Sequence, residues 1–177
     1  MSPATRRFAL VVHVCASVGW LGAVVGFGAL AIVGVASDDV DLVRSAYLSM
    51  EVLGTVVLLP LALLSLLSGL VMSLGTRWGL FRHYWVVFKL GINLFATAIL
   101  LAYTRTLEAL AELARAATTD ADVTALETPS PLVHAAAALA LLLVALTLAV
   151  YKPRGLTPLA TRGLRSTAAR GRTTRRQ

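Results

Sequence analysis

Residues 8–37 read FALVVHVCASVGWLGAVVGFGALAIVGVAS, and this stretch decides the fold of the chain. Its thirty residues include no Asp, Glu, Lys or Arg, and apolar side chains occupy every face of the corresponding helix. A helix needs about 20 residues to cross a hydrocarbon core that is about 30 Å thick. The stretch is therefore long enough and apolar enough to span a membrane.

Three further stretches share this character. Residues 52–76 and 128–151 carry no charged side chain, and residues 84–104 carry only Lys89. Only helices and closed barrels cross lipid without unsatisfied backbone groups, and a barrel needs short alternating segments that this sequence lacks. We therefore predict an all-α bundle of four transmembrane helices, with spans at about residues 8–36, 52–75, 84–104 and 130–151.

The composition favours a lipid environment and excludes several classes of protein. Hydrophobic residues make up 58% of the 177 residues and charged residues 14%, and the mean hydropathy is +0.79. Soluble domains carry about 25% charged residues. The one cysteine, Cys15, excludes an intrachain disulfide and a cysteine-clustered metal site. The sequence shows no phosphate loop, serine triad or paired carboxylates, so it assigns no catalytic residue and no metal ligand.

The charged residues are divided between the two sides of the predicted membrane. All nine acidic residues lie on one side, with Arg44, Arg105 and Arg115. The other Lys and Arg residues, of 16 in all, lie at the N-terminus, between spans two and three, at Lys89, and in the C-terminal tail. Loops rich in Lys and Arg remain in the cytoplasm. Both termini are therefore predicted to be cytoplasmic.

The connections between the spans differ in length. Residues 38–51 predict a short acidic connection, whereas residues 104–117 place apolar side chains at helical spacing. The third helix is therefore predicted to be long and to extend two or three turns outside the membrane. Residues 1–152 form one transmembrane domain, and residues 153–177 predict a basic, disordered cytoplasmic tail that binds anionic lipid headgroups. The tail brings no groove or aromatic platform, so nucleic-acid binding is not predicted.

Polar residues lie near the cytoplasmic ends of the first and third spans. His13 and Lys89 each lie five residues into their stretch, and Ser17 and Asn93 follow them by four residues on the same helix faces. A charged side chain inside lipid costs about 2.5–3.5 kcal/mol and so indicates a functional site. We expect His13 and Lys89 to meet across antiparallel neighbouring helices, directly or through one water or ligand. Adjacent cations repel, so at most one is charged unless an anion lies between them.

These four residues predict a pocket near the cytoplasmic leaflet for a cofactor or an anionic small ligand, with haem as one candidate cofactor. Structural interpretations stand beside this one. The Lys89 ammonium is close enough to the headgroups to extend toward them, and a membrane histidine such as His13 often bonds a neighbouring helix. Serines on the second span, such as Ser65 and Ser68, often bond their own backbone.

Other residues predict features of packing. Pro60 predicts a kink near the middle of the second span. Gly22 and Gly26 form a pair of small residues four apart, which allows another helix to approach closely. His134 lies near the outer end of the fourth span, roughly level with Glu51, where ionic pairing or exposure at the interface accounts for it.

Two segments carry a family resemblance. Residues 13–22 read HVCASVGWLG, and residues 68–93 read SGLVMSLGTRWGLFRHYWVVFKLGIN. They resemble a bacterial family of small four-helix integral membrane proteins of unknown function, and are more distantly similar to the HemJ type of protoporphyrinogen oxidase and the membrane domain of the copper-resistance protein CopD. The resemblance covers about residues 8–150. It implies a multi-pass protein of the bacterial cytoplasmic (plasma) membrane.

Within that resemblance, His13 matches the haem-linked histidine of the HemJ type, and Lys89 matches its helix-three lysine. The chain lacks the arginine that the HemJ type carries in the second half of helix one, so oxidase activity is not implied. Two functions remain as alternatives. One is binding of a cofactor or anionic ligand, and the other is a non-enzymatic role through helix packing with a membrane partner or as a homo-oligomer.

Overall fold

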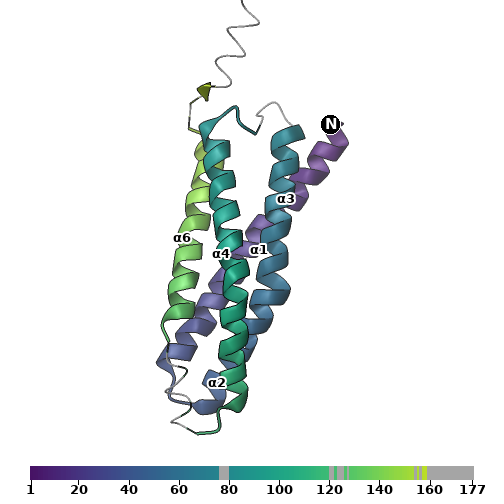
Figure 1. The fold of residues 1–177 in the computed structure, drawn as a ribbon. Coiled ribbons are helices and arrows are strands. Elements are labelled where there is room, and N and C mark those ends of the chain that lie inside the picture. The colour runs from purple at the N-terminus through teal and green to yellow at the C-terminus, as the bar shows by residue number, and fades with distance from the viewer. Residues whose placement is uncertain are drawn as a thin grey trace, which may run out of the picture.

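The fold was analysed in a computed structural model that describes residues 1–75, 80–119, 122, 126, 128–153, 155, 157 and 158. Figure 1 shows the helices that these residues form. They are α1 (Pro3–Ala36), α2 (Val40–Val52), the π-helix η1 (Leu53–Leu58), α3 (Leu59–Gly75), α4 (Tyr84–Ala116) and α6 (Ser130–Tyr151).

Four helices are long and apolar enough to cross a membrane, because α2, η1 and α3 join into one helix over Val40–Gly75. The predicted all-α architecture is therefore confirmed for the described residues, as is the presence of four helices able to span a membrane. Only 17–28% of the most apolar window of each span is buried inside the bundle. Apolar side chains such as Val18 and Val25, which are 63% and 55% exposed, consequently need lipid around them.

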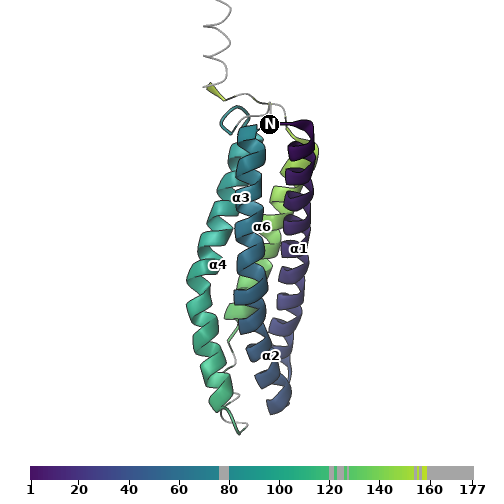
Figure 2. The same cartoon turned by 90° about the vertical axis from the view of Figure 1, so that its right-hand side faces the viewer.

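The four spans form an up-and-down bundle in which each helix packs on two others. α1 and α4 each pack against α3 and α6, so α1 and α4 lie diagonally opposite each other, as Figure 2 shows with α3 in front of them and α6 behind. The first residues of α1 and the last residues of α6 lie at the same end of the bundle. We call this end the terminal end. The opposite end, where α2 begins and α4 ends, is called the acidic end.

The core follows from the spacing of large side chains on α1. Trp20, Val24, Phe27 and Ala31 recur every three or four residues and are at most 4% exposed. The core continues through buried residues of the second span, such as Leu58, and through buried residues of α4 and α6. One face of each helix is thus committed to its neighbours, and the other faces remain available to lipid.

Most of residues 38–51, which were predicted to form a short acidic connection, belong to helix α2. Asp39 caps this helix by accepting hydrogen bonds from the N–H groups of Asp41 and Leu42 at 3.0 and 3.1 Å. Val43 and Tyr47 are buried, and the Tyr47 hydroxyl donates to the Leu126 carbonyl at 2.6 Å. The acidic residues therefore start a helix rather than fill a loop, because carboxylates stabilise a helix N-terminus.

The second span meets its proline with a π-helical turn. η1 ends at Leu58, two residues before Pro60, and the Leu59 N–H bonds to the Gly54 carbonyl, five residues back. Proline lacks an N–H and its ring clashes with the preceding turn, which a wider turn relieves. The helix therefore changes type over residues 53–58, just before Pro60, while the predicted kink stays a prediction.

The end of α4 lies beside α2 at the acidic end. α4 continues without a break from Tyr84 to Ala116. Arg115 forms an ion pair with Glu51 of α2 and another with Glu112 at 2.9 Å. Beyond α4, Asp122 accepts hydrogen bonds from the N–H groups of Thr118 and Thr119, which lower the pKa of its carboxyl group.

Most of the predicted tail lies outside the described residues. Of residues 153–177, the structure describes positions 153, 155, 157 and 158. Thr157 donates its backbone N–H to the Arg82 carbonyl at 3.1 Å and its hydroxyl to the Phe81 carbonyl. The start of the tail is thereby held against the segment that precedes α4.

The close approach of α4 to the π-helix gives a prediction about stability. A Cβ at Gly54 would lie 2.5 Å from Leu107 Cδ1, whereas nothing lies within 4 Å of one at Gly91. Gly54→Leu should therefore destabilise the bundle by about 1–3 kcal/mol through overpacking. Gly91→Leu should leave stability unchanged or raise it, since leucine is the better helix former. Thermal unfolding in detergent, followed by circular dichroism, measures both, and equal melting temperatures would contradict the packing described.

Candidate functional site

His13 and Lys89 meet inside the bundle, near the terminal end. The Lys89 Nζ lies 3.3 Å from His13 Nε2, so the predicted direct contact is present. The helices that bring them together are not antiparallel neighbours as predicted. α1 and α4 run in the same direction, because both start at the terminal end, and they lie diagonally in the bundle. The two side chains therefore reach toward each other across the bundle rather than along one interface.

The surroundings of His13 determine which ring nitrogen carries the proton. Nδ1 lies 3.1 Å from the Ser65 carbonyl and 3.0 Å from the Ser68 hydroxyl oxygen. A carbonyl oxygen only accepts, and the Ser68 hydroxyl already donates to the Leu64 carbonyl at 2.6 Å. Nδ1 must therefore be the donor. In neutral His13, Nε2 then carries a lone pair that accepts a hydrogen bond from Lys89.

Helix α3 provides the surface on which His13 lies. A Cβ at Gly69 would approach His13 Cε1 to 3.1 Å, so a larger residue would push the ring away. Four residues earlier, Ser65 is 1% exposed and shares a 2.9 Å hydrogen bond with Ser17 of α1. Glycine and serine thus bring α1 and α3 close and supply hydrogen-bonding partners, as small residues do in membrane helices.

Asn93 lies one helical turn beyond Lys89 on the same face of α4. The residue is 6% exposed, and none of the hydrogen bonds found within the described part of the chain involves its side-chain amide, whose atoms are not fully enclosed. Its backbone carbonyl accepts from the Thr97 hydroxyl at 2.7 Å. A buried amide has two donors and an acceptor to satisfy. Asn93 therefore adds unused hydrogen-bonding capacity beside the Lys89–His13 pair.

The positive charge at this site has no partner of opposite sign among the described residues. The acidic residues described by the structure belong to the acidic end, and the ion pairs there involve Arg115 rather than Lys89. A primary ammonium has three N–H donors, of which His13 accepts one. Within the described residues, no group of three or more His, Cys, Asp or Glu could hold a metal ion. The site is thus suited to hydrogen bonding and to binding negative charge.

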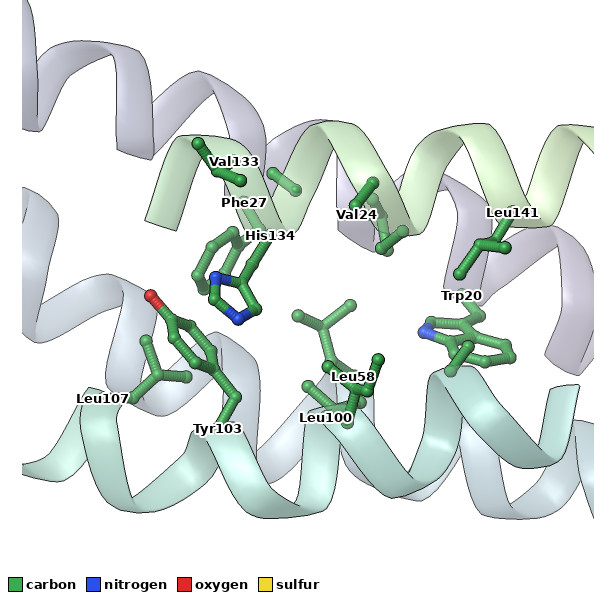
Figure 3. Close-up of a pocket in the computed structure, with 15 residues that line it drawn as sticks. Trp20, Val24, Phe27, Leu58, Leu100, Tyr103, Leu107, Val133, His134 and Leu141 are labelled. Carbon is green, nitrogen blue, oxygen red and sulfur yellow. The ribbon is translucent and has the colours of Figure 1, made fainter. Parts of the chain in front are cut away.

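A second constellation, which the sequence analysis missed, lies in the middle of the bundle. A cavity of about 200 Å³ is lined by α1, η1, α4 and α6, including the side chains of Trp20, Tyr103 and His134, as Figure 3 shows. The rings of Tyr103 and His134 stack with centroids 3.8 Å apart. Of the two explanations considered for His134, ionic pairing or exposure at the interface, the described residues show no ion pair with Glu51, because Glu51 binds Arg115 and His134 Nδ1 lies 2.8 Å from the Ser130 carbonyl.

Little in the sequence pointed to this arrangement. His134 and Ser130 are one turn apart on α6, so their contact is local, but Tyr103 belongs to α4 and bonds Ser130 at 3.0 Å. The sequence offered one signal for a cavity here, the alanine-rich segment that begins directly after His134. Small side chains leave room beside an aromatic pair.

Comparison of the chain with protein-family models, curated proteins and solved structures gives no match. The function of this protein is therefore inferred from the geometry of its own residues.

The assigned tautomer gives a prediction for nuclear magnetic resonance. In protein labelled with ¹⁵N-histidine at neutral pH, His13 should carry its proton on Nδ1, with Nε2 acting as an acceptor. Lys89→Met removes the donor, so the Nε2 resonance should move toward that of an imidazole nitrogen without a hydrogen bond. His134 lies in the other constellation and serves as the internal control. A proton on Nε2 of His13 together with an unprotonated Nδ1 would contradict the hydrogen bonds assigned to this ring.

Proposed function

We propose that this protein is a multi-pass membrane protein that binds an anionic small ligand, a carboxylate or a phosphate, at Lys89 and His13. One observation carries the proposal. A lysine within a membrane span contacts a histidine at 3.3 Å, and no carboxylate lies within ion-pair distance of it among the described residues. Buried charges in proteins are otherwise paired, so an anion from outside the chain is the missing partner.

The contact explains how the pair tolerates an intramembrane position. One proton is shared, since either the ammonium donates to a neutral imidazole or an imidazolium donates to a neutral amine. The pair thus carries at most one positive charge, because one of the two nitrogens must be the acceptor. With Lys89 as the ammonium, its two remaining N–H donors face the ligand. Asn93 lies one turn further along the same face of α4, and the Ser17 hydroxyl bonds Ser65 beside His13. Hydrogen bonds to charged groups contribute about 1.5–3 kcal/mol each.

Haem held through His13 fits this geometry poorly. An axial histidine needs one ring nitrogen for iron, but Nδ1 bonds α3 and Nε2 bonds Lys89. The cavity of about 200 Å³ lies at Trp20 and His134 rather than at His13, and sites for drug-sized ligands occupy about 300–1,000 Å³. The resemblance to the HemJ type concerns only where His13 and Lys89 lie in the sequence. The geometry around His13 favours an anion over haem iron as the ligand. We assign no catalytic residue and no enzymatic activity.

We further propose that both termini are cytoplasmic, in a bacterial plasma membrane. The basic residues at the terminal end support this orientation through the positive-inside rule. It directs residues 105–116 of α4 to the outer side, where the Glu51–Arg115 ion pair would meet water. Lys89 then lies near the cytoplasmic leaflet, within reach of anionic headgroups and of cytoplasmic metabolites.

A second candidate function is association with a partner helix or with another copy of the chain. Gly22 and Gly26 are exposed, and a Cβ at either position would meet nothing within 4 Å. The small-residue pair is therefore unused within the chain. This contrasts with Ser65 and Gly69, whose small side chains accommodate α1. Close approach of a second helix at Gly22 and Gly26 would use the first pair in the same way.

The proposed ligand can be tested with two probes, succinate for free carboxylates and dioctanoyl phosphatidate for lipid phosphates. Isothermal titration calorimetry of the protein in nanodiscs should detect binding of at least one. Lys89→Met should weaken that binding about tenfold or more, because it removes a charge-assisted hydrogen bond. Arg82→Gln removes an exposed cation from the same end and should have a smaller effect. Equal losses in the two variants, or no binding at all, would refute the proposal.

Variants of the glycine pair and of Lys89 distinguish the two candidate functions, because each function should respond to one of them and not to the other. Under the packing alternative, chemical cross-linking in membranes should yield a dimer or a partner adduct that Gly22→Leu and Gly26→Leu abolish and Lys89→Met does not. Under the ligand proposal, the glycine variants should bind the anionic probe as the wild type does.

The orientation can be tested with reporter fusions. A reporter active only outside the cytoplasm should give no signal at either terminus, and should give a signal when it is inserted after Thr118. Activity of the C-terminal fusion would reverse the assignment.

A further inference from the structure

The cavity in the middle of the bundle exists because small residues face each other across it. Ala96 on α4 and Ala135 and Ala138 on α6 line it, where larger side chains would fill the space. Ile99 and Val133 also line it and are 38% and 59% exposed. The cavity therefore reaches the surface that lipid covers, between α4 and α6. A molecule dissolved in the bilayer can enter there without crossing water.

Trp20 supplies a hydrogen-bond donor that the protein leaves unused. The residue is 2% exposed, and none of the hydrogen bonds found among the described residues involves its indole N–H. Because no fully enclosed side-chain nitrogen or oxygen there lacks a partner, the indole nitrogen itself keeps some accessible surface. Figure 3 shows the indole nitrogen turned toward the interior of the cavity. A buried indole N–H normally finds an acceptor. The cavity is the place from which that acceptor would come.

His134 supplies the complementary acceptor. Its Nδ1 faces the Ser130 carbonyl at 2.8 Å, and because a carbonyl only accepts, Nδ1 carries the proton. Nε2 of the neutral ring is then an acceptor, and no partner for it is found in the described part of the chain. Stacking on Tyr103, which itself bonds Ser130, holds the His134 ring in position. The acceptor is thus rigidly placed at the wall of the cavity.

The size and lining of the cavity define the ligand. A dry cavity of about 150 Å³ lined by apolar side chains binds benzene, so about 200 Å³ suits one ring with small substituents. No charged side chain lines it, which excludes an ionised ligand because the cost of burying an unpaired charge is high. Aromatic side chains from three helices, among them Phe27, favour a flat ring.

We propose that this cavity binds the ring of an uncharged, lipid-soluble phenol, a class that includes hydroquinones. The ring hydroxyl donates to His134 Nε2, and the Trp20 N–H donates to an oxygen or to the π-face at the other side of the ring. Any hydrocarbon tail leaves between α4 and α6. This site is separate from the anion site at Lys89, which lies nearer the terminal end and has a different chemistry.

Two matched probes test the proposal on the full chain in nanodiscs. 4-Propylphenol and propylbenzene differ only by the hydroxyl group, and their affinities can be measured by calorimetry. The phenol should bind more tightly by about 3- to 10-fold, the value of one neutral hydrogen bond. His134→Phe preserves an aromatic ring but removes Nε2, so it should abolish this preference while propylbenzene still binds.

Two further variants locate the site. Ala138→Leu fills the cavity and should abolish binding of both probes without lowering the melting temperature. Lys89→Met should leave both affinities unchanged, whether or not it affects binding of anions. The proposal is overturned if the wild type does not prefer the phenol, if the preference survives His134→Phe, or if binding survives Ala138→Leu. Equal binding of the two probes would identify a simple apolar void that lipid chains fill.

Discussion

A chain that crosses a hydrocarbon layer must satisfy every backbone N–H and C=O within itself, since lipid offers no partners. The four spans obey this constraint as continuous helices, and where Pro60 removes a donor, a π-helical turn redirects the neighbouring hydrogen bond. Lipid also weakens the hydrophobic drive for helix association, so close packing must replace it. Glycines provide that packing, at Gly54 against Leu107 and at Gly69 against His13.

Polar side chains inside the bundle face the same constraint, and the molecule meets it in two ways. Near the terminal end, serines of α3 and Lys89 occupy both nitrogens of His13. Nearer the acidic end, Ser130 bonds Tyr103, and its carbonyl bonds His134. Hydrogen-bonding capacity nevertheless remains at Asn93 and Trp20. The first lies beside a positive charge and the second beside an apolar cavity, so the two places are suited to chemically different ligands.

Much of the site at the terminal end could be predicted because depth in a membrane is readable from sequence. His13 and Lys89 are equally far from the ends of their apolar stretches, which placed them at one level. Their helices were nevertheless assigned the wrong relative direction, although two spans that start on the same side must be parallel. Helix α2 was missed because Asp38, Asp39 and Asp41 resemble a loop until the buried face of Val43 and Tyr47 is considered. The stack of Tyr103 on His134 joins residues 31 positions apart, which no local pattern reports.

By itself, the sequence determined the number of spans, their length and the end at which the intramembrane charge lies, because these depend on hydropathy and position along one helix. The tertiary structure alone decided that α1 and α4 lie diagonally, that His13 bonds α3 through Nδ1, and that alanines of α6 leave a cavity beside Trp20. Those features depend on the rotation of each helix about its axis. In lipid, where all faces of a helix can be equally apolar, only contact between helices selects that rotation.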